Sequence, residues 1–240
     1  MSGNKIFAFL LVAASAVASN ACGDPLFKFR YKLSIEANIN GQVKKASSVA
    51  EVAYWLDIDN SSHGSVKGEA LYLDLGSSCR PLIALLTARP RNGARNTSCQ
   101  WGENGPGCLH DLYGTDKLDW NDKARRLDGG EALLRQRGAR ALPIERLPDL
   151  VTFEDITDPA TVKEVSPNDP SKALGCDFGW QKITLEITDE PVTTGIEKKL
   201  SWLPDYYDKA LDGRRPGQRG KEMGLASEMS TVGFQMGMKR

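Results

Sequence analysis

Hydrophobic and polar residues alternate strictly from Phe27 to Asn40. Apolar and aromatic residues take every odd position and charged or polar residues every even one, which is the pattern of a strand with one buried face. The dipeptide Asn40-Gly41 follows, and it suits the positive φ angles of a type I′ turn. The pattern therefore predicts an antiparallel hairpin that extends from Phe27 to about Asp57.

A turn at Asn40-Gly41 also predicts the register of this hairpin, in which large residues oppose small ones on the buried face. The predicted pairs are Phe29 with Val52, Tyr31 with Ala50, Leu33 with Ser48, and Ile35 with Ala46. A shift by one residue would instead bury Lys45, Ser47 and Glu51, so the predicted register is favoured.

The rest of the chain predicts shorter elements. They are a polar turn over 57–64, a strand over 66–75, a helix over 123–137 capped by Asp122, a strand over 150–153, helical turns at 158–159 and 169–170, and a strand over 183–188. The continuous apolar run Pro81–Ala88 is consistent with a central strand covered on both faces or with a buried helix segment. Together these patterns predict a β-rich α+β fold: an antiparallel sheet opened by a long N-terminal β-hairpin, with one or two helices on one face.

The composition along the chain predicts three parts. Residues 1–21 read as a signal peptide, and residues 22–205 as a single β-rich globular domain that carries a long loop insertion over 89–121. Residues 206–240 are predicted to form a mobile C-terminal tail, because Gly213–Arg240 is rich in glycine and basic residues and has no sustained apolar period.

The N-terminal segment has the character of a secretory signal. Ile6–Ala18 is apolar except for one serine, but it is shorter than the roughly 20 residues that a membrane-spanning helix needs. Cleavage after Ala18 and cleavage after Ala21 are both compatible with the small residues there, and a retained apolar helix is the alternative. The second cut would make Cys22 the first residue, as in bacterial lipoproteins, although Ser19 and Asn20 depart from that signal. The resemblance implies lipidation of Cys22 and export to the periplasm or the outer membrane.

The chain has five cysteines, an inventory that also favours export. If Cys22 carries lipid, four remain, and an even number is typical of disulfides formed in an oxidising compartment. Four cysteines allow three connectivities. Proximity in the sequence favours Cys99 with Cys108, which leaves Cys79 with Cys176; free buried thiols are the alternative.

The balance of acidic and basic residues indicates which classes of partner the chain can bind. Lysine plus arginine and aspartate plus glutamate number 31 each, so the chain has no global basic field of the kind that nucleic-acid binding requires. We therefore expect no nucleic-acid partner. The expected contacts are a membrane tether through lipidated Cys22 and a protein or glycan partner.

Metal and cofactor motifs are weak. Asp57, Asp59 and Ser61 match the first odd positions of a calcium loop, but Ser62 and Gly68 stand where that loop needs glycine and glutamate. Cys99, Cys108, His110 and Asp111 could be written as a zinc set, yet an oxidising compartment favours a disulfide between the cysteines. We predict no metal and no cofactor.

Catalytic motifs are equally weak. The sequence contains no G-x-S-x-G elbow, phosphate loop, dinucleotide fingerprint or H-E-x-x-H. The favoured function is that of a cell-envelope protein acting as a non-catalytic binding or structural module, with no predicted catalytic residue. The alternative is an envelope hydrolase that uses carboxylates, together with His110, in the region of 89–121.

Two stretches resemble signatures of a family of uncharacterised bacterial exported proteins and predicted lipoproteins. They are LVTFEDITDPATVKEV at 150–165 and KITLEITDEPVTTGIEKKLSWL at 182–203. The opening hairpin is similar to the start of that family's domain. The resemblance covers Asp24 to Leu203, within which the cysteine loop would be an insertion. It implies export and assigns no activity or functional residue.

Overall fold

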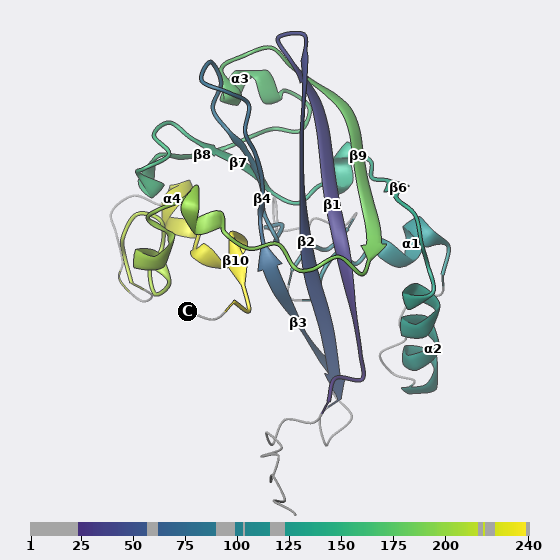
Figure 1. The fold of residues 1–240 in the computed structure, drawn as a ribbon. Helices are drawn as coiled ribbons and strands as arrows, with labels where there is room; N and C mark the ends of the chain where they lie inside the picture. Colours follow the sequence, from purple (N-terminus) through teal and green to yellow (C-terminus); the bar gives the residue numbers. More distant parts are fainter. Residues whose placement is uncertain are drawn as a thin grey trace, which may run out of the picture.

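The computed structural model describes residues 24–56, 62–89, 99–102, 104–115, 123–215, 218 and 224–238. The described chain forms two antiparallel sheets (Figure 1). The first has the strand order β10-β3-β2-β1-β9-β6 and the second the order β4-β5-β7-β8. The β-rich α+β fold is confirmed.

The first sheet contains β1 (Phe27–Ile39), β2 (Gln42–Leu56), β3 (Ser62–Glu69), β6 (Arg140–Ala141), β9 (Phe178–Thr188) and β10 (Gln235–Met236). The second contains β4 (Leu71–Leu73), β5 (Leu82–Ala84), β7 (Leu150–Phe153) and β8 (Val162–Glu164). The α-helices are α1 (Leu109–Tyr113), α2 (Lys123–Leu134), α3 (Pro170–Leu174) and α4 (Leu225–Glu228). The 3-10 turns are η1 (Ile144–Arg146), η2 (Pro159–Thr161), η3 (Ile196–Lys198), η4 (Leu203–Tyr206) and η5 (Thr231–Gly233).

The long hairpin β1-β2 is the centre of the first sheet, and its predicted register is confirmed. Phe29 pairs with Val52, Tyr31 with Ala50, Leu33 with Ser48, and Ile35 with Ala46. Asn40 and Gly41 have φ angles of 49° and 85°, as a type I′ turn requires. The odd positions of β1 are buried along its whole length, so one face of this sheet forms the wall of the main core.

The predicted single strand over 66–75 is wrong, because the chain changes sheets within it. β3 ends at Glu69 and β4 begins at Leu71 in the other sheet. At the break, the buried Glu69 carboxylate accepts hydrogen bonds from Ile196 N (2.8 Å) and Gln235 Nε2 (2.9 Å). The start of the strand also differs: residues 62–64 of the predicted turn belong to β3, and 57–61 lie outside the described residues.

The second sheet is covered on both faces, as the apolar run over 81–88 suggested. Leu82 and Ala84 of β5 face the first sheet, whereas Ile83 lies in a second core on the opposite face. The central strand predicted there is confirmed over 82–84, and the helical alternative is wrong. Two apolar faces require two covering layers.

The C-terminal segment supplies the second covering layer. The predicted mobile tail over 206–240 is therefore wrong for the described part of that range. Leu211, Met229 and Phe234 are buried in the second core, and β10 pairs with β3. Figure 1 shows this segment, in yellow and light green, beside the second sheet. These apolar residues are spaced irregularly by turns, so they produced no helical or strand period.

The remaining predicted elements agree with the structure apart from their bounds. α2 ends three residues before the predicted helix end, and β9 begins at Phe178 rather than at 183. Asp158-Pro159 opens η2, where the Asp158 side chain accepts a hydrogen bond from Ala160 N at 2.9 Å. Asp122 lies outside the described residues. In Figure 1, α1 and α2 lie together on the β6 side of the first sheet.

Candidate functional site

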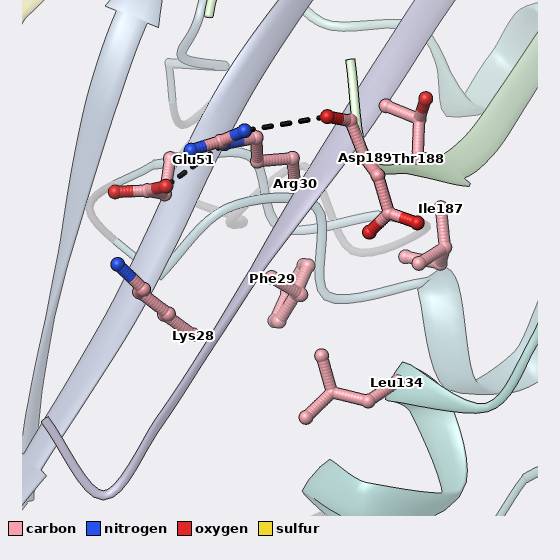
Figure 2. A pocket seen from close by; sticks show the side chains of 8 residues that line it. All are labelled: Lys28, Phe29, Arg30, Glu51, Leu134, Ile187, Thr188 and Asp189. Carbon is pink, nitrogen blue, oxygen red and sulfur yellow. Dashed lines mark hydrogen bonds and ion pairs between the residues drawn. The ribbon is translucent and has the colours of Figure 1, made fainter. Parts of the chain in front are cut away.

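A surface recess of about 230 Å³ lies where β1 extends beyond the end of β9. Figure 2 shows its lining, which we call the β1/β9 recess. It consists of Lys28, Phe29, Arg30, Glu51, Leu134, Ile187, Thr188 and Asp189. These residues come from β1, β2, the C-terminal end of α2, and the end of β9 with the residue that follows it.

The unequal lengths of two paired strands create this recess. Arg30 pairs with Thr188, the last residue of β9, whereas β1 begins three residues earlier, at Phe27. The chain after β9 turns away through Pro191, which has no N–H to donate to a ladder. α2 closes the far side, and Gly130 lies so near the Phe27 ring that an added Cβ would approach it to 2.9 Å.

One side of the recess is apolar. Phe29 and Ile187 are buried residues of the main core, and Leu134 is packed against that core. Figure 2 shows Leu134 on α2 facing Phe29 across the recess. The Ile187 N–H donates to the Tyr113 hydroxyl at 3.1 Å, and that hydroxyl donates to Gly138 O at 2.7 Å. This wall is therefore fixed by both packing and hydrogen bonds.

The other side is charged. Arg30 donates from Nε to Glu51 Oε2 at 2.9 Å, and its Nη1 lies 3.4 Å from Asp189 O and 3.3 Å from Glu190 O. The second terminal nitrogen of Arg30 has no hydrogen-bond partner among the described residues. Lys28 likewise has no ion-pair partner among the described residues. The rim carries two cations, Lys28 and Arg30, and two carboxylates, Glu51 and Asp189, each of which is paired with an arginine. The remaining donors of Arg30 and Lys28 lie beside the apolar wall.

Lys32, the next residue on the exposed face of β1, is neutralised by two neighbouring carboxylates of the same chain. The Lys32 ammonium contacts the carboxylates of Glu190 and Glu186. The hydrogen bond to Glu190 raises the pKa of Lys32, and attraction to Glu186 adds to that effect. Lys32 thus ties the segment after β9 to β1 and holds the wall of the recess in place.

Chemically, this arrangement can contact a ligand through both charge and shape. Cationic N–H donors bind carboxylates well, and the apolar wall favours a ligand with a hydrophobic part. The described residues include no group of three histidine, cysteine or acidic side chains that could hold a metal ion. The buried carboxylates Glu69 and Asp149 have structural partners; Asp149 Oδ2 accepts from Arg89 N and Nε at 2.9 and 2.7 Å.

None of the described residues of the region 89–121, to which the hydrolase alternative was assigned, lines the recess, and several of them pack into the core. His110 is 8% exposed in α1, where its Nδ1 lies 2.9 Å from Thr115 Oγ1, and Asp111 beside it is exposed. Trp101 is buried and donates from Nε1 to Arg146 O at 2.7 Å. Residues 90–98, 103 and 116–122 of this region lie outside the described residues.

Both predicted disulfides are present. Cys99 joins Cys108 within the region 89–121. Cys79 joins Cys176 across 97 residues and links the β4–β5 connection to the α3–β9 connection. Disulfides of this kind form and persist in oxidising compartments, which supports an exported chain. Cys22 lies outside the described residues. No helix in the described part of the chain has the length and apolar character needed to cross a bilayer.

No protein-family model, curated protein or solved structure matches the chain. The recess was not predicted from the sequence. The alternation in β1 places Lys28, Arg30 and Lys32 on one exposed face, which is the available sequence signal. Their convergence with Asp189 depends on the pairing of β1 with β9, a contact across about 160 residues.

Proposed function

We propose that this chain is an exported cell-envelope protein, tethered to a membrane through a lipid on Cys22, that acts as a non-catalytic binding module. The observation that carries the binding role is the β1/β9 recess, where an apolar wall lies beside the donors of Arg30 and Lys28. Such a surface suits a ligand that presents a carboxylate next to a hydrophobic group. Export is supported by the two disulfides and by the apolar segment Ile6–Ala18.

The envelope location is tested by fractionating cells that express the full chain and by measuring the mass of the mature N-terminus. We expect the wild type in the membrane fraction, with a lipid mass on Cys22, and the Cys22→Ala variant without that mass. A mature chain that begins at Ser19 without modification would refute the tether. A chain that keeps Met1 in a reducing cytosol would refute export itself.

The binding role is tested by photo-cross-linking in living cells with p-benzoylphenylalanine at position 28, next to Arg30. A matched control carries the same group at Val232, which is exposed and lies in the C-terminal segment. Co-sedimentation with purified cell-wall sacculi covers a glycan ligand. We expect a discrete adduct or sacculus binding that the variant Arg30→Gln abolishes and Arg215→Gln leaves intact. Equal behaviour of the two arginine variants in both assays would refute the recess as the binding site.

A further inference from the structure

The hairpin has a second unusual feature, at the outer edge of β2. β3 pairs with β2 only from Glu51 onward, so residues 42–50 of β2 have β1 on one side and no paired strand on the other among the described residues. Ser48 Oγ donates to Glu69 O at 2.6 Å, so the chain that leaves β3 passes beneath the inner face of β2 and does not extend along its edge. We call Val43–Ser47 the β2 edge.

The hydrogen bonds of Val49 show which backbone groups this edge presents. Val49 N–H donates to Thr193 Oγ1 at 2.9 Å, and Val49 O accepts from Thr193 N at 3.0 Å. The N–H and C=O of Val49 therefore point away from β1. Because backbone groups alternate with a period of two along a strand, those of Val43, Lys45 and Ser47 point the same way. The β2 edge thus presents three outward N–H and C=O pairs.

The protein itself already pairs a segment with β2 at Val49, two residues beyond the C-terminal end of the β2 edge. The chain after β9 crosses in front of β1 and β2 in Figure 1 and bonds to Val49 through Thr193. Val49 is 3% exposed as a result. Val43, six residues earlier on the same face, is 54% exposed, and Lys45 and Ser47 between them are exposed as well. The outward backbone groups of β2 are therefore hydrogen-bonded at Val49, whereas from Ser47 to Val43 they have no partner among the described residues.

Charge determines which kind of strand fits. Lys45 pairs across the hairpin with Glu36, whose neighbour on β9 is Lys182, so the outer face carries two lysines and one glutamate here. This end of the outer face is therefore net positive. A second copy paired about a two-fold axis at Lys45 would place two Lys45 ammonium groups opposite each other, which is unfavourable. An acidic residue at that position is attracted to Lys45.

We propose that the β2 edge binds an extended, acidic segment of a partner protein by strand addition. The segment's main chain pairs with Val43, Lys45 and Ser47, and the residue opposite Lys45 is acidic. The residue opposite Val43, two positions along, is apolar because it packs against that exposed side chain. This inference concerns a different surface from the β1/β9 recess and does not depend on it.

The test uses the mature chain and a fluorescein-labelled, N-acetylated peptide with the sequence Thr-Thr-Glu-Thr-Val-Thr. The control peptide has lysine in place of glutamate. Fluorescence polarisation gives the affinities, and amide hydrogen exchange shows where protection appears. We expect tighter binding of the acidic peptide by the wild type and new protection at Val43, Lys45 and Ser47.

Two matched pairs separate the edge from the rest of the molecule. Ser47→Pro removes one outward N–H, which has no partner among the described residues, and should weaken binding at least ten-fold, whereas Ser47→Ala keeps that N–H and should bind within two-fold of wild type. Lys45→Glu should reverse the preference between the peptides, whereas Lys45→Gln should only reduce it. Circular dichroism melting curves check that each variant folds.

Three results would overturn the proposal. The first is a wild type that binds neither peptide. The second is binding that folded Ser47→Pro and Lys45→Glu retain, or protection that appears at the recess and not at the edge. The third is concentration-dependent dimers with Val43–Ser47 protected, since the occupant would then be a second copy. Protection at the recess would indicate that the peptide binds at the proposed ligand site, whereas the other results leave the recess function untouched; Arg30→Gln tests that function separately.

Discussion

Replacing Phe234 by alanine tests whether the C-terminal segment is an integral layer of this fold. The Phe234 ring is 0% exposed and lies 6.1 Å from the Phe153 ring and 5.6 Å from the Trp202 ring, measured between centroids. Truncating a buried phenylalanine costs about 3–5 kcal/mol, because packing is lost and a cavity remains. We expect a loss of about 4 kcal/mol in the free energy of unfolding, since two aromatic contacts disappear as well.

Urea unfolding followed by tryptophan fluorescence measures this change. With a slope of about 2 kcal/mol per molar urea, the midpoint should fall by about 2 M. The control is Val232→Ala, which changes a side chain that is 48% exposed two residues earlier and should alter stability by less than about 0.5 kcal/mol. If Phe234→Ala and Val232→Ala unfold at the same urea concentration, residues 224–238 are not a packed layer and the reasoning fails.

Three further predictions concern the covalent links, a buried carboxylate and a buried hydroxyl. Loop entropy predicts that replacing both Cys79 and Cys176 by serine lowers the free energy of unfolding by about 4.7 kcal/mol. The same change at Cys99 and Cys108, which close a shorter loop, should lower it by about 2.6 kcal/mol. Similar urea midpoints for the two double variants would contradict this prediction. Glu69→Gln should cost about 1–3 kcal/mol by thermal melting, because an amide NH₂ replaces one of two acceptor oxygens that hold the C-terminal layer; a change below about 0.5 kcal/mol would argue against that role. Tyr31→Phe should stabilise the protein by about 1 kcal/mol at pH 8, because the buried hydroxyl has no partner among the described residues. Burial raises the pKa of Tyr31 in the folded protein, so above the ordinary tyrosine pKa of about 10 ionisation favours the unfolded state. Above that pH the wild type should lose stability more steeply than Tyr31→Phe. Parallel profiles of stability against pH for the two proteins would refute this.

The local sequence pattern predicts the elements that depend only on neighbouring residues: the hairpin, the aspartate-proline turns and the short disulfide. The hairpin register follows from its turn residues and from the rule that a one-residue slip exchanges the two faces. η2 and α3 follow from aspartate-proline pairs, whose preference for the first turn of a helix needs no distant contact. The short disulfide was favoured by proximity, and the long one followed from it by elimination.

Errors arose where distant segments meet. The break between β3 and β4 depends on Glu69 bonding to Ile196 and Gln235, more than 120 residues away. The sequence of the C-terminal segment predicts a tail, because its apolar residues have no regular spacing. Their burial depends on the outer face of β5 and β7, which the local sequence of the tail cannot reveal.

The sequence by itself determined the β-rich class, the central hairpin with its register, and the presence of four cysteines able to form two disulfides. These features follow from the period of two along a strand, the backbone preference of Asn-Gly and the chemistry of thiols. Only the tertiary structure decided that β1 extends beyond β9 to form the recess, that one end of β2 has no second partner strand in the described part of the chain, and that the C-terminal segment covers the second sheet. Each of these features depends on which strands and faces that are distant in the sequence come into contact, and the local sequence pattern does not predict such contacts.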